Sequence, residues 1–396
     1  MDSRELLTRG IAEVVDRAHL GQHLSRGRPL RVKFGIDPTG AQLHLGHAVP
    51  LRVLRRWQDL GHVAVLIIGD YTASIGDPSG RTETRPPLSD AAIKKNYATY
   101  ERQAFKIIDQ KRTEVRWQSE WFKKFSLKDL IGQAAQLSVG WILSHETFRD
   151  RAKNRQPLAF HELFYPLLQA YDSVAVKADV EVGGLDQKFN LLTGRELMRA
   201  HGLPPQDVVL TKYLIGTDGQ KMGKSLNNFI ALEEEPFEMF GKIMSLPDTV
   251  LRDYFELATD VALADFEKMH WSGAEARNTK MFLARKIVEE YHGVEKSNEA
   301  MRKWEDFREG KTDGRTVEVK FWKALRDVVV NAGYARSNSD AQRLFEQGAV
   351  YLDGKIEKDW RKNPWDVGLG WHQLVIGKKK RTVKFLIQAL PKKKTI

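Results

Sequence analysis

Cysteine is absent from the 396-residue sequence, which excludes disulfides, thiolate zinc sites and cysteine nucleophiles. Also absent is any apolar run near the roughly 18 residues that a transmembrane helix needs. The first 20 residues have no apolar core and carry Asp2, Glu5, Glu13 and Asp16, whereas targeting peptides are poor in acids. We therefore expect an amphipathic N-terminal helix and a cytoplasmic protein with no membrane anchor, although some secreted proteins also lack cysteine.

Two common site patterns are missing as well. The histidines of residues 37–47 (DPTGAQLHLGH) have neither an HExxH pattern nor a clear third ligand beside them, so we expect no metal site. The lysines of residues 217–225 (TDGQKMGKS) do not fit GxxxxGK[ST], which disfavours Walker-type phosphoryl transfer.

Positive charge is in surplus, with 63 Lys and Arg against 52 Asp and Glu and a formal net charge of +11. Lys and Arg gain by displacing counterions from phosphates, so a polyanionic partner is one interpretation. A solvated basic surface is the other, and it is common. The position of the basic residues along the chain has to decide between the two.

Strand-like and helix-like segments alternate over the first half of the chain. Strands are expected at 31–37, 63–70, 177–184 and 206–216, and helices at 45–60, 89–175 and 187–202. Strands that alternate with helices predict an α/β fold with a doubly wound, Rossmann-like parallel sheet.

Three domains are expected. Residues 1–225 form the α/β domain with a helical insertion at about 110–170, residues 226–318 a helical domain with a charged linker, and residues 319–396 a small α+β module. In the last of these, SNSDAQRLFEQG predicts a capped helix, AVYLDGKI a hairpin, and LVIGKKKRTVKFLI two strands around a basic turn.

His44 and His47 lie where a strand and turn give way to a helix. Backbone N–H groups and the helix dipole favour an anion at such a place, and the imidazoles can donate hydrogen bonds to phosphate oxygens. Gly46 would let a flat ring or a phosphate approach the backbone. Alone, this HxxH pattern is weak, since surface or capping histidines would look the same.

Lys221 and Lys224 stand three residues apart among small residues. Such a pair can form a flexible cationic clamp for pyrophosphate, whose charge rises as it leaves. The alternative is an exposed lysine-rich loop. In IGDPSG, Asp77 could hold an ammonium group, and Arg81 and Arg85 just after it could reach a polyphosphate, unless the segment is an ordinary turn.

Two further segments carry polar groups. In YPLLQAYD, helical spacing places Tyr165, Gln169 and Asp172 on one face, which lines a pocket or simply faces solvent. In GGLDQKFN, Asp186 and Gln187 follow a strand, at the carboxyl edge where ligands bind in such sheets.

The order of these segments, HxGH early and KMxKS after the last strand, resembles the class I aminoacyl-tRNA synthetases. GIDPTG, IGDPSG, YPLLQAYD and GGLDQKFN are similar to the bacterial tyrosyl branch in particular, as are ADVEVGGLDQKFNLLTGREL and MFGKIMSLPD. The similarity covers almost the full length, and the C-terminal segment resembles the alpha-L RNA-binding module.

The resemblance implies ATP-dependent activation of L-tyrosine to tyrosyl-adenylate and transfer to the 3′ end of tRNA(Tyr). Mg²⁺ would accompany ATP as part of the substrate complex, with no tightly bound cofactor. The implied catalytic residues are His44, His47, Lys221 and Lys224. The implied ATP-binding residues are Asp37, Gly46, Arg81, Arg85, Asp186, Met222 and Ser225.

By the same resemblance, the tyrosine-binding residues are Gly35, Asp77, Tyr165, Gln169, Asp172 and Gln187, with Asp172 accepting the phenolic hydroxyl. The tRNA-binding residues are Arg336, Arg343, Lys355, Lys378, Lys379 and Lys380. A homodimer with its interface in the helical part at about 110–170 is also implied.

Two positions depart from the family pattern. Gly223 stands where the KMSKS consensus has serine, and Lys33 stands where much of the family has a tyrosine that touches the substrate hydroxyl. The alternatives are a tryptophanyl-tRNA synthetase, a catalytically idle synthetase-like RNA-binding protein, and a small-molecule adenylyltransferase, which would not need an RNA-binding module.

Overall fold

The computed structural model describes residues 5–79, 88–226, 228–273, 275–309, 315–318, 324–367, 370–377 and 381–387. The chain divides into two compact units, Met1–Asn298 and Glu299–Ile396. This division falls inside the charged segment 295–315, whereas the boundaries expected after residues 225 and 318 stay predictions. Among the residues described, no helix is both long and apolar enough to cross a membrane.

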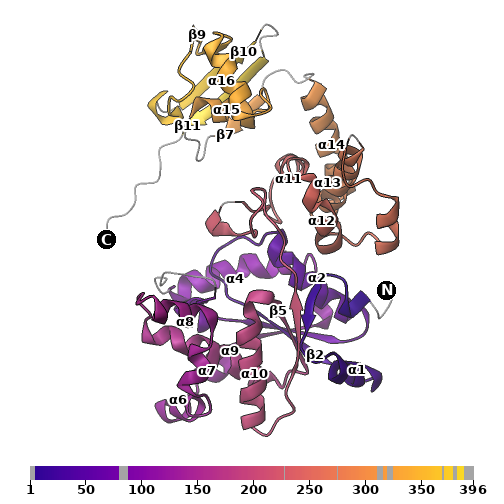
Figure 1. The fold of residues 1–396 in the computed structure, drawn as a ribbon, viewed down its shortest axis with the longest axis vertical. Coiled ribbons are helices and arrows are strands. Elements are labelled where there is room, and N and C mark those ends of the chain that lie inside the picture. Colours follow the sequence, from indigo (N-terminus) through magenta and orange to yellow (C-terminus); the bar gives the residue numbers. More distant parts are fainter. Residues whose placement is uncertain are drawn as a thin grey trace. The chain divides into compact units, whose positions relative to one another are not determined.

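The first unit is built on a six-stranded sheet with the order β1-β6-β5-β2-β3-β4 (Figure 1). The strands are β1 (Ile11–Val14), β2 (Arg31–Ile36), β3 (Val63–Ile68), β4 (Thr113–Trp117), β5 (Val180–Gly184) and β6 (Asp207–Thr211). All neighbours are parallel except β1 and β6, which are antiparallel. The predicted α/β fold with a parallel sheet is confirmed.

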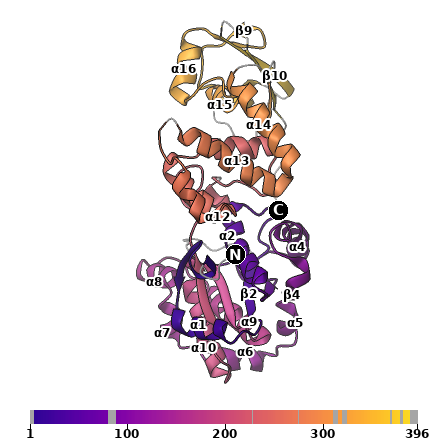
Figure 2. The same ribbon diagram turned by 90° about the vertical axis from the view of Figure 1, so that its right-hand side faces the viewer.

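Helices cover both faces of this sheet (Figure 2). On one face lie α9 (Tyr165–Val176) and α10 (Lys188–Ala200), where Val65 and Ile67 of β3 pack with Leu168. The other face is covered by α2 (Leu45–Asp59), whose apolar positions are buried along most of its length. Because helices cover β3 on both faces, none of its side chains faces solvent. This explains why its sequence is an uninterrupted apolar run.

The topology places a crevice between β2 and β5. From β2 the chain continues outward to β3 and β4, and it then returns to build β5 and β6 on the other side. Ligands bind beyond the carboxyl ends of the strands at such a switch point. The segments GIDPTG and GGLDQKFN directly follow β2 and β5, so the fold brings them side by side.

Two expectations for the first unit are wrong. The N-terminus is not one amphipathic helix, because a 3₁₀ turn at Glu5–Leu7 and strand β1 precede α1 (Arg17–Ser25). The segment IAEV instead pairs along the edge of β6. The stretch 89–175 is not wholly helical, because β4 pairs with β3 inside it.

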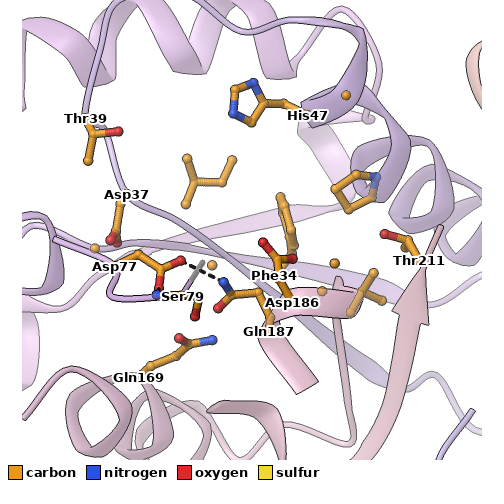
Figure 3. A pocket seen from close by; sticks show the side chains of 18 of the residues that line it. Phe34, Asp37, Thr39, His47, Asp77, Ser79, Gln169, Asp186, Gln187 and Thr211 are labelled. Carbon is orange, nitrogen blue, oxygen red and sulfur yellow. Dashed lines mark hydrogen bonds between the residues drawn. The ribbon is translucent and has the colours of Figure 1, made fainter. Parts of the chain in front are cut away.

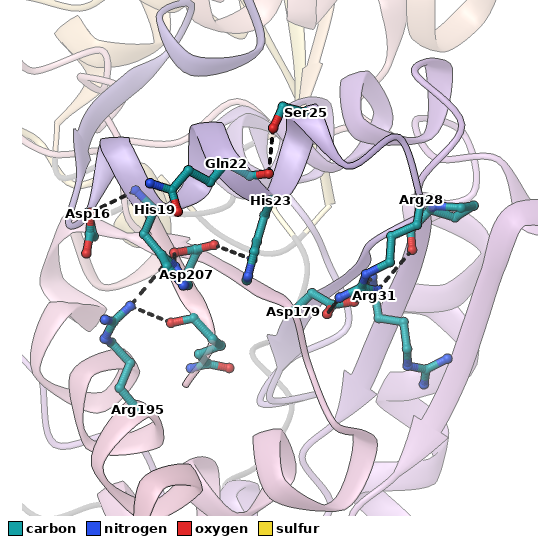
Figure 4. A network of polar contacts seen from close by, with 12 residues as sticks. Asp16, His19, Gln22, His23, Ser25, Arg28, Arg31, Asp179, Arg195 and Asp207 are labelled. Carbon is teal, nitrogen blue, oxygen red and sulfur yellow. Dashed lines mark hydrogen bonds and ion pairs between the residues drawn. The ribbon is translucent and has the colours of Figure 1, made fainter. Parts of the chain in front are cut away.

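Helix α1 is held to the sheet by a polar network (Figure 4). His19 Nδ1 lies 2.8 Å from Oδ1 of Asp207 and His23 Nδ1 lies 3.0 Å from Oδ2, while the Arg195 guanidinium is 4.0 Å from the same carboxylate. Asp207 is fully buried at the start of β6, so these three side chains compensate its charge.

The remaining helices of this unit are shorter or lie beyond the sheet. The helical part at about 110–170 contains α5 (Ser119–Phe122), α6 (Leu127–Ala134), α7 (Val139–Leu143) and α8 (Glu146–Lys153), preceded by α3 (Thr72–Ile75) and α4 (Asp90–Ala104). After the sheet come α11 (Pro236–Met244), α12 (Leu251–Ala258) and α13 (Ala276–His292), and then α14 (Val294–Glu309), within which the first unit ends at Asn298. The helical character expected after Ser225 is thus confirmed.

The second unit contains a five-stranded sheet with the order β7-β11-β10-β8-β9. Its elements are β7 (Arg315–Glu318), α15 (Leu325–Asn331), α16 (Asn338–Glu346), β8 (Val350–Leu352), β9 (Lys355–Ile356), β10 (Gly370–Ile376) and β11 (Arg381–Ile387). The capped helix, the hairpin and the final strand pair match the sequence patterns, with Asp353 and Gly354 both at positive φ in the hairpin turn. Leu325, Phe345 and Leu374 belong to one buried core.

Candidate active site

A cavity of about 700 Å³ opens beyond the carboxyl ends of the parallel strands. It is lined by residues of all five sequence segments that carried polar groups. The predicted site residues among its lining are Gly35, Asp37, His44, Gly46, His47, Asp77, Tyr165, Gln169, Asp172, Asp186, Gln187, Lys221, Met222 and Lys224. Residues up to 189 positions apart in the sequence therefore meet at one site.

The two histidines lie together at the start of α2. His44 is the N-cap residue, and its ring lies 3.7 Å, centroid to centroid, from that of His47. The backbone N–H of His44 donates to Nδ1 of His47 over 3.2 Å. A Cβ on Gly46 would come within 3.0 Å of the His44 ring, so the intervening residue is glycine because the imidazole occupies that space.

Both imidazoles are held in the neutral form. Burial, followed by the charge of Lys224, lowers the pKa of His44 to about 3. Burial also lowers the pKa of His47 well below its ordinary value, and His44, Lys224 and Lys221 add to that effect. At neutral pH each ring therefore carries one N–H donor. A ring would take up a second proton only when an anion binds beside it.

The two lysines reach the cavity from the loop after β6. Lys221 Nζ lies 2.8 Å from Oδ2 of Asp186 and 4.0 Å from the centroid of the Tyr213 ring. Lys224 Nζ donates to the hydroxyl of Tyr100 over 2.9 Å. The two ammonium groups are thus held by an exposed ion pair and a phenol, contacts that an incoming polyphosphate can replace.

Asn228 fixes the conformation of this lysine loop. Its buried amide accepts from the N–H of Gly223 over 2.8 Å, and it donates to Oδ1 of Asp218 over 2.6 Å and to the carbonyl of Lys221 over 3.1 Å. The carboxyamide thereby ties three points of the loop together. This explains how a loop with glycine at position 223 keeps a defined shape.

Asp172 lies on α9, lines the cavity and is only 2% exposed. Gln118 donates to its Oδ2 over 2.9 Å, whereas its Oδ1 is buried without a hydrogen-bond partner. Burial raises the pKa of Asp172 to about 8, against the lowering effects of Lys33 and Gln118. A buried carboxylate oxygen that lacks a donor is suited to a ligand hydroxyl.

Tyr165 and Asp37 form a second polar pair in the cavity. The phenol of Tyr165 donates to Oδ2 of Asp37 over 2.9 Å, and the Thr72 hydroxyl donates to Oδ1 over 2.6 Å. Burial, with the charges of Asp37 and Asp77 next, raises the pKa of Tyr165 well above its ordinary value. Tyr165 therefore remains a neutral hydrogen-bond donor at every physiological pH.

Asp77, Gln187 and Gln169 converge from three elements on the same space (Figure 3). The Gln187 amide donates to Oδ2 of Asp77 over 2.7 Å, and the N–H of Ser79 donates to its Oδ1 over 2.8 Å. Burial raises the pKa of Asp77. A cationic ligand group near these three side chains would meet a carboxylate and an amide oxygen.

The cavity is lined by both cationic and acidic side chains. Lys221 and Lys224 lie near the two neutral histidines, and Asp37, Asp77 and Asp172 are contributed by other segments. This arrangement fits a ligand with an anionic part and a part that carries an ammonium and a hydroxyl group. The lysines, the histidine N–H groups and the N-terminus of α2 could stabilise charge that grows on a phosphate.

Among the described residues, the side chains that together could bind a metal ion lie outside the cavity. The one group of at least three possible ligands is His19, His23 and Asp207, outside the cavity. These are the side chains of the α1 network, in which the imidazoles and the Arg195 guanidinium already surround the carboxylate. We therefore assign the group to the packing of α1.

The other predicted residues are not among the described residues that line the cavity. Arg81 and Arg85 lie outside the described residues, as do Lys378, Lys379 and Lys380, and Ser225 is described only in its backbone. Arg336, Arg343 and Lys355 are exposed residues of the second unit.

Sequence reasoning missed several cavity residues. Thr72 and Gln118 line the cavity, and Gln118 directly follows β4, the strand that was read as helix. A polar residue just after a strand would have been the signal. Lys33 was noted only as a departure, and Asn228 was not singled out. Nothing in their local pattern indicates their partners, which lie 136 or more residues away for Lys33.

Comparison with known proteins gives a consistent result. The family described as tRNA synthetases class I (W and Y) matches residues 25–309. The tyrosine–tRNA ligase of Carboxydothermus hydrogenoformans is 43% identical over 390 residues, covering 92% of this chain and 95% of that protein. The tyrosine–tRNA ligase of Thermotoga maritima is 44% identical over 363 residues, with 90% of each chain covered.

Solved structures show the same fold at lower identity. A C-terminally truncated mitochondrial tyrosyl-tRNA synthetase of Aspergillus nidulans has a TM-score of 0.65 and 22% identity, covering 76% of this chain and 92% of that one. The tyrosyl-tRNA synthetase of Archaeoglobus fulgidus complexed with L-tyrosine has a TM-score of 0.60 and 20% identity, covering 75% and 98%. Because the family match spans residues 25–309 and the relatives above 40% identity cover about nine-tenths of the sequence, this chain belongs to the class I tRNA synthetases of the tryptophan and tyrosine type.

Proposed function

We propose that this chain is a tyrosine–tRNA ligase. It joins L-tyrosine to ATP, giving tyrosyl-adenylate and pyrophosphate, and then transfers the tyrosyl group to the 3′ end of tRNA(Tyr). The observation that carries the proposal is the partnerless Oδ1 of Asp172, in the same cavity as both histidines and both lysines. A phenolic hydroxyl supplies the missing donor. An indole also has a donor, but its N–H is part of a bicyclic ring of a different shape. The names of the relatives favour tyrosine in the same way.

Adenylate formation needs no nucleophile from the protein. A tyrosine carboxylate oxygen attacks the α-phosphorus of ATP, and the bond to the pyrophosphate oxygen breaks. The N–H groups of His44 and His47 donate hydrogen bonds to the α-phosphate as it gains a fifth oxygen. Lys221 and Lys224 hold the leaving pyrophosphate. The protein contributes position and complementary charge.

The other polar residues orient the two substrates. Asp186 is proposed to bind the ATP ribose once Lys221 turns to the phosphates, and Met222 and Gly46 to pack against the adenine. Asp77, Gln169 and Tyr165 are proposed to hold the ammonium group of tyrosine. Mg²⁺ enters with ATP as part of the substrate, because Mg²⁺ is usually bound through substrate phosphates and waters.

The second unit is proposed to bind the tRNA. Arg336 and Arg343 are exposed at the start and within α16, and Lys355 is exposed on the hairpin strand β9. Lys378, Lys379 and Lys380 are proposed to contact the tRNA as well. A capped helix beside a basic hairpin fits recognition of an RNA backbone. Since aminoacylated tRNA is used by ribosomes in the cytoplasm, we place the enzyme there.

Exposed apolar side chains support a homodimer through the helical part at about 110–170. In that part, four large apolar side chains are 60% to 74% exposed: Leu127, Ile131, Val139 and Phe160. Monomers rarely leave such a set in water, so a second copy of the chain is the proposed cover.

Ile131→Asp is therefore expected to shift the protein from dimer to monomer, because a buried unpaired carboxylate opposes association. Sedimentation velocity at micromolar concentration measures the change. Val294→Asp provides the control, since Val294 is also exposed but lies at the start of α14. A wild-type protein that sediments as a monomer would contradict the proposed interface.

The assignment to tyrosine is tested by amino-acid-dependent exchange of labelled pyrophosphate into ATP. We expect exchange with tyrosine and little with tryptophan or phenylalanine. Asp172→Asn should lower kcat/KM for tyrosine about 10- to 100-fold, the usual loss for a hydrogen bond to a charged group. Exchange supported by tryptophan alone, or by no amino acid, would overturn the assignment.

Gly46→Ala is expected to slow the same exchange about 10- to 100-fold, because the added methyl would displace the His44 imidazole from the phosphate. The thermal unfolding midpoint should change far less than the rate. Unaltered exchange would show that the His44 ring is free to move aside without loss of catalysis.

A further inference from the structure

Lys33 is a buried lysine of β2, and its chain neighbours Phe34 and Gly35 line the cavity. Its side chain is fully buried and does not line the cavity. Its ammonium lies 2.9 Å from Oε1 of Glu181, and it donates to the carbonyl of Gln169 over 3.0 Å and to the hydroxyl of Ser173 over 2.8 Å. One ammonium group therefore has three partners from two different elements.

These partners surround the proposed phenol-binding carboxylate. Gln169 and Ser173 belong to α9 on either side of Asp172, and Glu181 lies on β5. Lys33 itself lies on β2. It thus fixes the turn of α9 that carries Asp172 against both central strands of the sheet.

We propose that Lys33 is a positioning residue that determines the selectivity of the cavity for a phenol, by fixing the Asp172 turn and by placing a positive charge near its carboxylate. This inference rests on the proposed tyrosine activation. Lys33 does not touch the substrate, so it does not replace the hydroxyl contact of the family's tyrosine. It acts through Asp172 alone.

Charged and polar groups from several elements surround Asp172. These groups are Lys33, Gln118, Glu181, Asp37 and Tyr165. Burial raises the pKa of Asp172 to about 8, and Lys33 is the largest of the influences that lower it. Removing Lys33 should raise that pKa further. The ionised carboxylate is the form that accepts the phenolic hydrogen. Selectivity for tyrosine over phenylalanine should therefore rise with pH through about 8 in the wild type. In a variant that lacks Lys33, the same rise should occur at higher pH.

The test compares Lys33→Met with Lys33→Met/Glu181→Gln by pyrophosphate exchange, with tyrosine and phenylalanine as substrates from pH 6.5 to 9. The single variant leaves Glu181 buried without its partner and can lose stability for that reason alone. The double variant removes both charges while it keeps similar side-chain volumes, so it tests the charge in a folded protein. Unfolding midpoints verify that it is folded.

The informative quantity is the ratio of kcat/KM for tyrosine to kcat/KM for phenylalanine. Phenylalanine lacks only the hydroxyl, so changes in ATP binding or folding cancel in this ratio. Lys33 lowers the pKa of Asp172 and Glu181, a weaker influence, raises it, so the double variant loses two opposing effects. We therefore expect the ratio at pH 7 to fall in the double variant and to fall further in the single variant, with its rise displaced to higher pH in both.

The outcomes separate this inference from the proposed function. A wild-type ratio and pH profile in the folded double variant would overturn the role of Lys33, and the lysine would then be only a structural ion pair. Absence of tyrosine-dependent exchange in the wild type would instead overturn the proposed function. A lowered ratio with a displaced profile supports the inference.

Discussion

Lys224→Ala is expected to lower kcat for tyrosine-dependent pyrophosphate exchange about 100- to 1000-fold, the loss typical for a donor that stabilises transition-state charge. In the absence of substrate, the Lys224 ammonium contacts the Tyr100 hydroxyl over 2.9 Å beside the histidines. Negative charge on the pyrophosphate increases as it leaves the α-phosphorus. The interaction with Lys224 is therefore stronger in the transition state than with bound ATP, so kcat should fall more than KM for ATP rises.

Lys224→Arg and Lys268→Ala complete this experiment. Arginine retains the charge and should recover part of the rate, although its planar group places the charge differently. Lys268 is an exposed lysine with one ion pair to Asp265, outside the cavity, so its removal should leave exchange unchanged. If Lys224→Ala raised only KM for ATP, the lysine would contribute ground-state binding and the proposed role in departure of pyrophosphate would be wrong.

The strands and motifs that form the catalytic cavity could be predicted from the sequence because their signals are local. The apolar run of β3 requires burial on both faces, and parallel strands carry the segments after them to one edge. Asp186 was expected at this edge because it follows a strand, and it lines the cavity together with Asp37. Their spacing in the sequence alone, 149 residues, carries no such information.

The errors have physical causes as well. Strand β4 (Thr113–Trp117) is half-buried along its whole length, and its alternation of Val115 and Trp117 with Glu114 and Arg116 covers only five residues, too few to stand out inside a helical region. Strand β1 has only four residues, and it is a strand because it pairs with β6. In both cases a tertiary partner decides the conformation, and a local pattern cannot report that partner.

The partners of Lys33 illustrate a further limit. A lysine in a strand is normally taken as a surface residue, and nothing near position 33 reveals a buried acid. Glu181 is equally exceptional in the apolar strand β5, yet the two are 148 residues apart. Only the parallel pairing of β2 with β5, which places Lys33 beside Glu181, shows that each charge compensates the other.

A truncated protein that ends at Glu309 is expected to keep adenylate formation and lose tRNA charging. Every described residue of the cavity belongs to the first unit, so tyrosine-dependent pyrophosphate exchange should remain within about twofold of the full chain, since distant and independent sites act additively. Charging should fall about 100-fold or more in kcat/KM for tRNA(Tyr), because the basic residues beyond 330 supply phosphate contacts in the proposal.

Salt dependence distinguishes loss of RNA contacts from damage to the catalytic unit. For the full chain, log kcat/KM for tRNA should fall steeply as log salt concentration rises, and the slope should be shallower for the truncated protein because fewer counterions are released. The double substitution Arg336→Ala/Arg343→Ala, on exposed positions of the second unit, should reproduce part of that change in the intact protein. Equal loss of exchange and of charging on truncation would contradict this division, since adenylate formation would then depend on the second unit.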